Sequence, residues 1–212
     1  MKVKDFTFNM FGVNTYVLWN TDTLEAAVVD PGMISQDEEH AIADFIKLNG
    51  LGVVHLVNTH LHIDHTFGEE FIRDNYGVKV EANRADSFLG EARQAQARMF
   101  GLNLSPLPLS IDVELNDGDK IFLGDECLEV MTVPGHSPGS IVLYAPQSGF
   151  VLTGDVLFKQ SIGRTDLVAG NHNQLVDGIK AKLLTLPPET VVYPGHGPST
   201  TIGDEIRHNA FL

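Results

Sequence analysis

The sequence predicts an α/β fold in which two strand-rich halves build an αββα sandwich with helices on the outer faces. Short β-branched runs of strand length occur in two blocks along the 212 residues, and each block is followed by segments with helical periodicity. This order fits two packed sheets covered by helices. No stretch has the composition of a linker, so we expect a single domain over residues 1–212.

The first block predicts three consecutive strands and a capped helix. The strands are expected at residues 3–8, 15–19 and 25–29. Ser35 and Glu38 form the Ser-x-x-Glu pattern of a capping box, which places a helix start there. The apolar face of this helix is made by Ile42, Phe45 and Ile46. The Asn-Gly pair that follows suits the end of the helix.

The middle of the chain predicts shorter elements. We expect a strand at 53–57, a helix at 67–75, a strand at 78–81 and a helix at 83–100. Packing is the expected role of the last helix, and its inward residues should be Phe88, Ala92, Ala95 and Met99. Residues 102–111 contain two prolines and cannot form a regular helix, which leaves a surface connection or the lining of a substrate groove.

The second block predicts further strands and a long helix. The strands are expected at 112–115, 120–123, 127–133, 141–144, 150–153 and 191–193. A helix over 171–184 has Asn171 as its N-cap and apolar residues at helical spacing. Two prolines follow it and suit its end.

The densest group of functional side chains lies in the motif Thr59-His60-Leu61-His62-Ile63-Asp64-His65. Imidazole nitrogens and carboxylate oxygens are good ligands for zinc and iron. His60 and His62, two residues apart in an extended loop, can point to the same side. A single residue of this kind is more simply interpreted as part of a polar surface loop, but four potential ligands within six residues indicate a metal site.

Three more potential ligands follow strand-like runs elsewhere in the chain. His136 and His196 each follow a Pro-Gly pair, and Asp155 follows a glycine. Residues in such positions should gather beyond the carboxyl ends of the strands, where open α/β sheets bind their ligands. Two ions fit the donor atoms. One ion would be bound by His60, His62 and His136, and a neighbouring ion by Asp64, His65 and His196. Asp155 could bridge the two ions.

The order and spacing of these residues resemble the signature of the metallo-β-lactamase superfamily, a His-x-His-x-Asp-His motif followed by His, Asp and His. Asp155 stands where many of the β-lactamases themselves have cysteine, and the segments around Asp155 and Arg164 are similar to glyoxalase II-like hydrolases. The resemblance spans Asn14 to His196. It implies two mixed sheets with the metal site at one edge of the αββα sandwich, and an activity similar to that of hydroxyacylglutathione hydrolase.

The ligand set predicts chemistry that needs no serine or cysteine nucleophile. Two ions that share one water lower its pKa towards neutrality and polarise a substrate carbonyl, and Asp64 can orient the hydroxide. A thiolate leaves without a dedicated general acid, so we expect a binuclear hydrolase of small-molecule thioesters. Zinc is the expected metal, with iron and manganese as alternatives. Arg164 is the candidate cation for a substrate carboxylate, unless it pairs with Asp166.

Two other functions remain open. A persulfide dioxygenase would hold one iron with His60, His136 and Asp155, and a metal-binding protein without turnover would have no need of Asp64 as an orienting group. The chain continues for 16 residues after His196. Full-length glyoxalase II enzymes carry a C-terminal helical domain there that contacts glutathione, so we expect little discrimination between small thiols.

Composition disfavours several partner classes. A formal charge of −14, without a cluster of Lys and Arg, disfavours nucleic acid and anionic membranes as partners. We find no apolar stretch long enough to span a bilayer and no secretory signal in the first ten residues. The single cysteine, Cys127, cannot form an internal disulfide and is interpreted as a buried thiol. These features predict a cytoplasmic protein.

The residues outside the ligand motifs include one further candidate. Asp30 precedes a Pro-Gly pair at the end of a predicted strand, where its carboxylate could orient a ligand histidine from behind. The histidines that match no ligand position are interpreted as structural, and they are His40, His55, His172 and His208.

Overall fold

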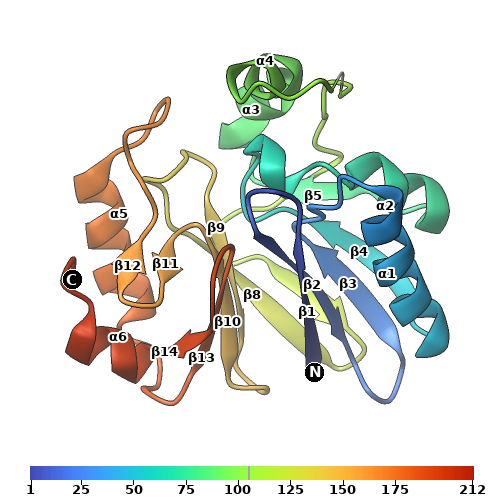
Figure 1. Ribbon diagram of the computed structural model, residues 1–212. Helices are drawn as coiled ribbons and strands as arrows, with labels where there is room; N and C mark the ends of the chain where they lie inside the picture. Colours follow the sequence, from blue (N-terminus) through green and yellow to red (C-terminus); the bar gives the residue numbers. More distant parts are fainter. Residues whose placement is uncertain (105) are drawn as a thin grey trace.

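The computed structural model describes residues 1–104 and 106–212. Two six-stranded sheets pack face to face, and helices cover the outer face of each (Figure 1). This arrangement confirms the predicted αββα sandwich. A hydrophobic cluster between the sheets joins side chains of both, such as Leu18 and Val29 from one and Leu128 and Leu143 from the other. The buried apolar faces of the two sheets therefore hold the two halves of the molecule together.

The first sheet has the strand order β1-β2-β3-β4-β5-β6. Its strands are β1 (Lys2–Phe8), β2 (Val13–Trp19), β3 (Glu25–Val29), β4 (Gly52–Val57), β5 (Val80–Ala82) and β6 (Val113–Glu114). The first three strands are antiparallel, whereas β3 to β6 run parallel to one another. The parallel strands are joined by helical crossovers, as parallel pairing requires.

The second sheet has the order β14-β13-β10-β9-β8-β7. Its strands are β7 (Lys120–Leu123), β8 (Glu126–Thr132), β9 (Ile141–Ala145), β10 (Phe150–Gly154), β13 (Val191–Pro194) and β14 (Thr200–Thr201). Only the β10–β13 pair is parallel among the pairs described for this sheet. A small hairpin of β11 (Leu157–Phe158) and β12 (Ser161–Ile162) lies beside it. Both sheets are therefore mixed.

Helices occupy the two outer faces and one end of the sandwich (Figure 1). The first sheet is covered by α1 (Gln36–Leu48) and α2 (Glu69–Tyr76), and the second by α5 (His172–Gly178), the π-helical turn η3 (Ile179–Leu183) and α6 (Ile202–His208). The remaining helical segments are η1 (Ile63–His65), η2 (Arg84–Asp86), α3 (Ser87–Glu91) and α4 (Arg93–Met99). Ser35 and Glu38 form the predicted capping box, and the Asn171 side chain caps α5.

The predicted helix over 83–100 is wrong in two respects. The chain breaks at Ala92 into α3 and α4, and the buried residues of α4 are Arg93, Gln96 and Ala97. Met99, predicted to face the core, is 68% exposed. Arg93 takes the inward position because its guanidinium donates to the carbonyl oxygens of Thr66 and Leu107 and to the Glu70 carboxylate. Burial of an arginine whose two terminal nitrogens are both paired reverses the face that apolar periodicity predicts.

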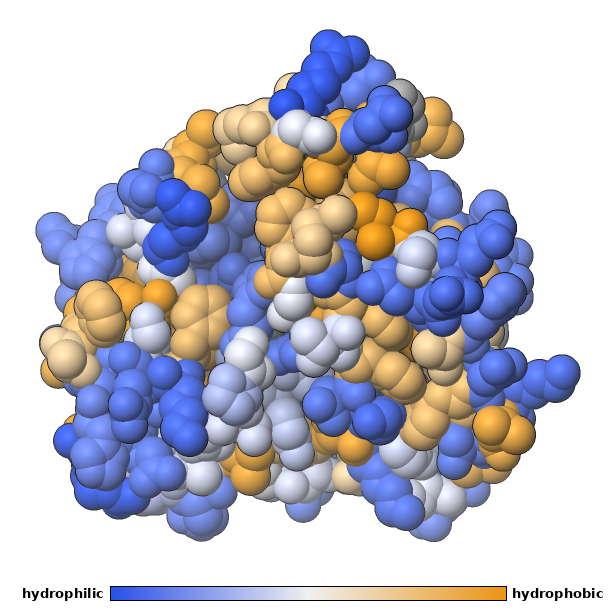
Figure 2. Space-filling view, viewed as in Figure 1, coloured by the Kyte–Doolittle hydropathy of each residue, from blue (hydrophilic) through white to orange (hydrophobic). Residues whose placement is uncertain are grey.

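The surface has a hollow near the α3–α4 segment that a ligand could enter. The molecule is hollowed beside the α3–α4 segment, and hydrophobic surface borders the hollow (Figure 2). The expected connection over 102–111 includes residue 105, which lies outside the described residues. Leu104, Pro106 and Leu107 line a separate depression, not this hollow. Within the described ranges, every helix is too short or too polar to cross a bilayer.

Candidate metal centre

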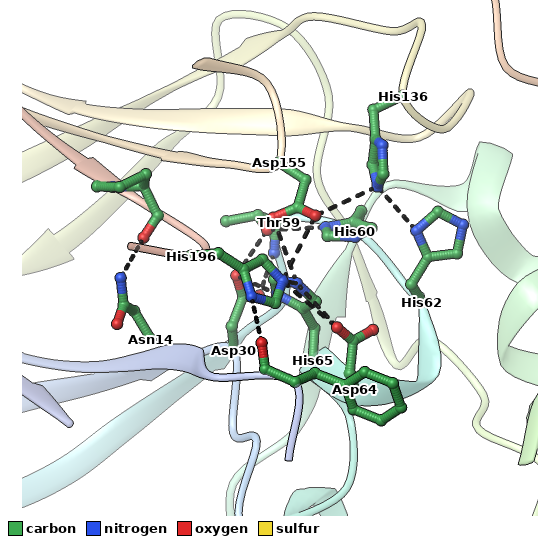
Figure 3. Close-up of polar contacts among 12 residues, drawn as sticks. Asn14, Asp30, Thr59, His60, His62, Asp64, His65, His136, Asp155 and His196 are labelled. Carbon is green, nitrogen blue, oxygen red and sulfur yellow. Dashed lines mark hydrogen bonds and ion pairs between the residues drawn. The ribbon is translucent and has the colours of Figure 1, made fainter. Parts of the chain in front are cut away.

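The seven predicted ligand residues lie together at one end of the sandwich (Figure 3). They come from four segments, each of which follows or ends a strand. The segment after β4 carries His60, His62, Asp64 and His65; His136 follows β8, Asp155 follows β10 and His196 follows β13. The second sheet thus contributes three of the segments and the first sheet contributes one.

The first set of three histidines lies within reach of a single ion. Potential ligand atoms of His60, His62 and His136 all lie within 4.8 Å of one another. His62 Nδ1 lies 2.9 Å from His136 Nε2. All three nitrogens therefore point into one small space.

The second set lies beside the first. Asp64, His65 and His196 also bring their potential ligand atoms within 4.8 Å of one another. His65 Nε2 lies 3.3 Å from His196 Nε2, which is 3.4 Å from Asp64 Oδ2. Asp155 lies between the sets, because its Oδ1 is 3.4 Å from His65 Nε2 and its Oδ2 is 3.6 Å from His136 Nε2. A third group, made by His60, His65 and Asp155, also has its potential ligand atoms within 4.8 Å of one another and spans the two sets, so Asp155 lies where it could contact an ion in either.

The hydrogen bonds of the histidines fit metal binding. His65 Nδ1 donates to Asp30 Oδ2 (3.1 Å), His136 Nδ1 to the Arg164 carbonyl (2.8 Å) and His196 Nδ1 to the Phe11 carbonyl (3.0 Å). Because each acceptor is an oxygen without a hydrogen, Nδ1 carries a proton in each ring, and Nε2 is the nitrogen left to face the site. This pattern fixes the ring orientation that a metal ligand needs.

Two buried atoms in the site lack hydrogen-bond partners. Among the described residues, neither His60 Nε2 nor Asp155 Oδ1 meets the geometry of a hydrogen bond, although His65 Nε2 lies 3.4 Å from the latter. A buried acceptor without a donor is costly, and a cation would satisfy both atoms. The donor set and these two atoms together fit divalent metal ions.

The protonation states also favour cation binding. Burial, followed by the neighbouring His136, lowers the pKa of His62 to about 4, and burial lowers the pKa of His60 well below its usual value. For Asp155, burial acts to raise the pKa, but the adjacent His65 and other imidazoles outweigh burial and hold it well below the usual range. His60, His62 and Asp155 are thus in the forms that bind metal. For His65 and His196, burial acts to lower the pKa but the neighbouring carboxylates outweigh it and raise the pKa, so these two rings would release a proton when metal binds.

Asp30 is the carboxylate behind His65, as the sequence suggested. Its Oδ1 accepts the Thr59 amide (2.7 Å) and its Oδ2 accepts the Thr59 hydroxyl (2.6 Å) in addition to His65 Nδ1. Asp30 has a positive φ of 51°, and Thr15 donates to its carbonyl. A single aspartate therefore fixes both the start of the ligand motif and the ring of His65.

Asp86 is a positioning residue that sequence reasoning missed. Its Oδ2 accepts the Leu61 amide (3.2 Å) and the Ser137 hydroxyl (2.7 Å), and its Oδ1 accepts the Gly139 amide (2.6 Å). Leu61 lies between two ligands of the first set and Ser137 follows the third. One buried carboxylate thus ties together the two loops that carry this set. Nothing in the sequence signalled this role, because Asp86 lies inside the helix predicted over 83–100.

The loop that carries His196 is held by strand β2. Asn14 Nδ2 donates to the carbonyls of Pro194 and Gly197, and the Tyr16 hydroxyl donates to Pro194 as well. A Cβ atom at Gly195 would meet the Asp155 carboxylate and the His65 ring. Glycine is therefore required there for the close approach of the loop to the site.

The other predicted residues lie outside the cluster. The Arg164 guanidinium makes two 2.7 Å contacts with Asp166, so the internal ion pair weighed in the sequence analysis is present. His55 pairs with Glu81 at 2.6 Å. Cys127 is buried in β8 and free of a disulfide.

The ligand cluster forms the floor of an open pocket of about 250 Å³. His62, Asp64, His136, Asp155 and His196 reach its surface. The arrangement can therefore present metal ions to a small molecule.

Comparison with known proteins agrees with this geometry. Residues 9–196 match the family model described as the metallo-β-lactamase superfamily. The chain is 34% identical to a hydroxyacylglutathione hydrolase named GloC from Haemophilus influenzae, over 100% of this chain and 98% of that protein.

Two solved structures are similar over almost their whole length. The B3 metallo-β-lactamase BLEG-1 shares 35% identity at a TM-score of 0.90 and covers 100% of this chain and 99% of that one. The protein TTHA1623, solved in a di-iron-bound form, shares 32% identity at a TM-score of 0.86 and covers 99% of this chain and 100% of that one. The family match, the GloC relative and these folds show that the chain belongs to the metallo-β-lactamase superfamily.

Proposed function

We propose that the protein is a binuclear metal-dependent hydrolase that cleaves thioesters. The observation that carries the proposal is the pair of three-residue ligand sets at the floor of one open pocket, with the carboxylate of Asp155 between them. When bound, two divalent ions would lower the pKa of a shared water and polarise a carbonyl oxygen. The fit of the ligand atoms supports two ions, and the site lies where a substrate can reach it.

Asp64 is the proposed orienting group for the attacking water. Its Oδ2 lies 3.4 Å from His196 Nε2, its side chain is partly exposed, and it lines the pocket. The imidazoles of His65 and His196 outweigh the effect of burial and lower the pKa of Asp64, so it is an acceptor at neutral pH. An ionised carboxylate can accept a hydrogen bond from water and aim its lone pair at the substrate.

The pocket lining favours a leaving group that departs without a proton. Among the described residues that line it, there is no Lys, Tyr, Ser, Thr, Cys or Glu. A thiolate is a weak base and needs no general acid, whereas the nitrogen of an amide is strongly basic when it leaves. The lining therefore supports a thioester more than an amide. The GloC relative, whose name specifies a glutathione thioester, supports the same reaction.

The direct test measures thiol release from acyl thioesters by zinc- or manganese-loaded protein, with a β-lactam as comparison substrate because of the similar structure of BLEG-1. Asp64→Asn should lower kcat about 100-fold or more, the usual scale of a general acid–base group. Because Asp64 also belongs to the second ligand set, the two proteins are compared at free metal concentrations that load both with two ions per chain, where their melting temperatures should be similar. Asp74→Asn, an exposed change on α2, is the matched control.

Two outcomes would contradict the proposal. The thioesterase proposal is wrong if protein loaded with two ions per chain releases no thiol from any of the acyl thioesters. A loss of turnover in Asp64→Asn that merely follows lost metal or lost folded protein would remove the orienting role from that residue.

A single-iron persulfide dioxygenase is the second candidate. The di-iron-bound form of TTHA1623, a protein 32% identical to this chain, supports iron as the metal, although two ions are bound there and this candidate uses one. The subset of His60, His136 and Asp155 would hold the iron, and His136 Nε2 lies 3.6 Å from Asp155 Oδ2. Oxygen uptake with a persulfide, absent with thioesters, would establish this reaction in place of hydrolysis.

A further inference from the structure

Apolar side chains surround the ligand cluster and form what we call the apolar wall. Its members are Phe11, Leu89, Met99, Phe100, Leu167 and Val168. They come from the turn before β2, from α3–α4 and from the loop before α5. Hydrophobic surface borders the hollow in the space-filling view (Figure 2). The wall therefore adjoins the candidate metal centre, and through the buried Leu89 it also touches the core under the first sheet.

Several of these side chains are exposed although they are large and apolar. Met99 is 68% exposed, Phe100 44% and Val168 73%. The inward face of α4 is made by other residues, so Met99 and Phe100 are not needed to cover the sheet. Phe100 packs edge-to-face on Phe11 at a centroid distance of 5.3 Å. Contiguous exposed apolar surface of this kind marks a binding site.

The charges around the pocket disfavour an anionic ligand portion. Arg164 is the only cation among the described residues that line it, and both of its contacts go to Asp166. Bound metal would offset the charge of Asp64 and Asp155 at the floor, but away from the floor the described residues of the lining offer no unpaired Lys or Arg. The two carboxylates of glutathione would find no unpaired cation in this lining. The surface that remains for recognition is apolar.

We propose that the apolar wall binds an apolar acyl group, and that the length of this group, not the identity of the thiol, decides which thioester is cleaved. The inference rests on the proposed function and names its substrate class. A volume of about 250 Å³ equals that of roughly eight water molecules at ~30 Å³ each, which suits an acyl chain of about four to eight carbons. The carbonyl carbon of the thioester must lie at the ligand cluster to be attacked. The acyl chain attached to that carbon therefore lies against the adjoining apolar wall.

The experiment uses metal-loaded protein and a series of N-acetylcysteamine thioesters with acetyl, butanoyl, hexanoyl and octanoyl groups. We expect kcat/KM to rise about threefold per methylene up to hexanoyl, since each buried methylene favours binding. Phe100→Ser and, on the opposite side of the pocket, Val168→Ser should each reduce the hexanoyl-to-acetyl ratio to within about threefold. Leu48→Ser, at an 85% exposed site on α1, should leave the ratio unchanged.

The outcomes separate this inference from the proposed function. Hydrolysis of all four esters with equal kcat/KM would overturn the apolar-acyl inference and leave the thioesterase intact, whereas no hydrolysis of any ester would overturn both. A kcat/KM at least a hundredfold higher for hexanoyl-glutathione than for hexanoyl-N-acetylcysteamine would show that the thiol decides which thioester is cleaved, and would overturn the inference. If Phe100→Ser converts a dimer into a monomer without changing the ratio, the wall is an interface between copies of the chain and the inference is wrong.

Discussion

Glu69, at the first position of α2, is a buried acid that the proposed chemistry does not use. It is fully buried, and neither carboxylate oxygen has a hydrogen-bond partner of acceptable geometry within the described part of the chain. Burial raises the pKa of Glu69 to about 8, and the nearby amide of Asn58 offsets only part of this effect. The folded protein therefore holds a proton on Glu69 at neutral pH that the unfolded chain releases.

This shift predicts how stability changes with pH. Because the folded pKa lies above the unfolded value, the folded state binds more protons than the unfolded state between pH about 4.5 and 8, and the free energy of unfolding falls as pH rises through that range. Glu69→Gln removes the titration and should gain about 1–4 kcal/mol over wild type at pH 8.5, with little difference at pH 4.5. Denaturant unfolding at both pH values measures it.

Glu91→Gln, at an exposed position, serves as the control and should follow wild type. Identical pH profiles for Glu69→Gln and wild type would show that Glu69 is already ionised in the folded protein.

At the scale of single residues, the sequence revealed functional residues that lie close together in the chain. His60, His62, Asp64 and His65 are recognisable because they stand side by side. Asp86 has partners 25, 51 and 53 residues away, so nothing in its neighbourhood in the sequence reveals them. Asp30 was found only because a strand end is a characteristic place for a ligand-orienting carboxylate.

At the scale of elements, the strands were predicted better than the helices around the pocket. Long β-branched runs such as β2 and β8 are recognisable as strands from their own residues. The two-residue strands β11, β12 and β14 form only through pairing with neighbouring segments, so they were missed. Helix α6 was missed as well. The wrong prediction of one helix over 83–100 also matters for function, because it assigned Met99 to the core, whereas Met99 belongs to the apolar wall. Periodicity identifies an apolar face without telling whether protein or ligand covers it.

The η2–α3 element should matter to the first ligand set through Asp86. Asp86→Asn replaces a carboxylate that accepts three hydrogen bonds with an amide that cannot accept all of them. We expect metal affinity at this set to fall about 10- to 100-fold, the usual effect of losing a group that supports a ligand. Competition with a chromophoric chelator measures the affinity.

Asp177→Asn, on the exposed side of α5, is the matched control for that measurement. Unchanged affinity in Asp86→Asn, with the fold intact by circular dichroism, would mean that the two loops hold their positions without the carboxylate.

At the scale of the whole molecule, the candidate centre joins both sheets. Four segments contribute ligands, so bound metal should hold them together in the folded state only. At a free metal concentration about 1,000 times Kd, binding adds about 4 kcal/mol, or about 8–16 °C in Tm for a chain of this size. Calorimetry before and after chelation tests this. A melting temperature that does not change after verified metal removal would contradict a site built from these segments.

The number of ions bound per chain tests the central claim most directly. Metal-free protein titrated with zinc or manganese should saturate at about two ions per chain, and activity should appear as the second ion binds. His196→Ala removes one nitrogen from the second set and should lower the stoichiometry to about one at the same free metal concentration. Saturation of wild type at one ion, with neither metal content nor turnover altered by His196→Ala, would contradict the binuclear account.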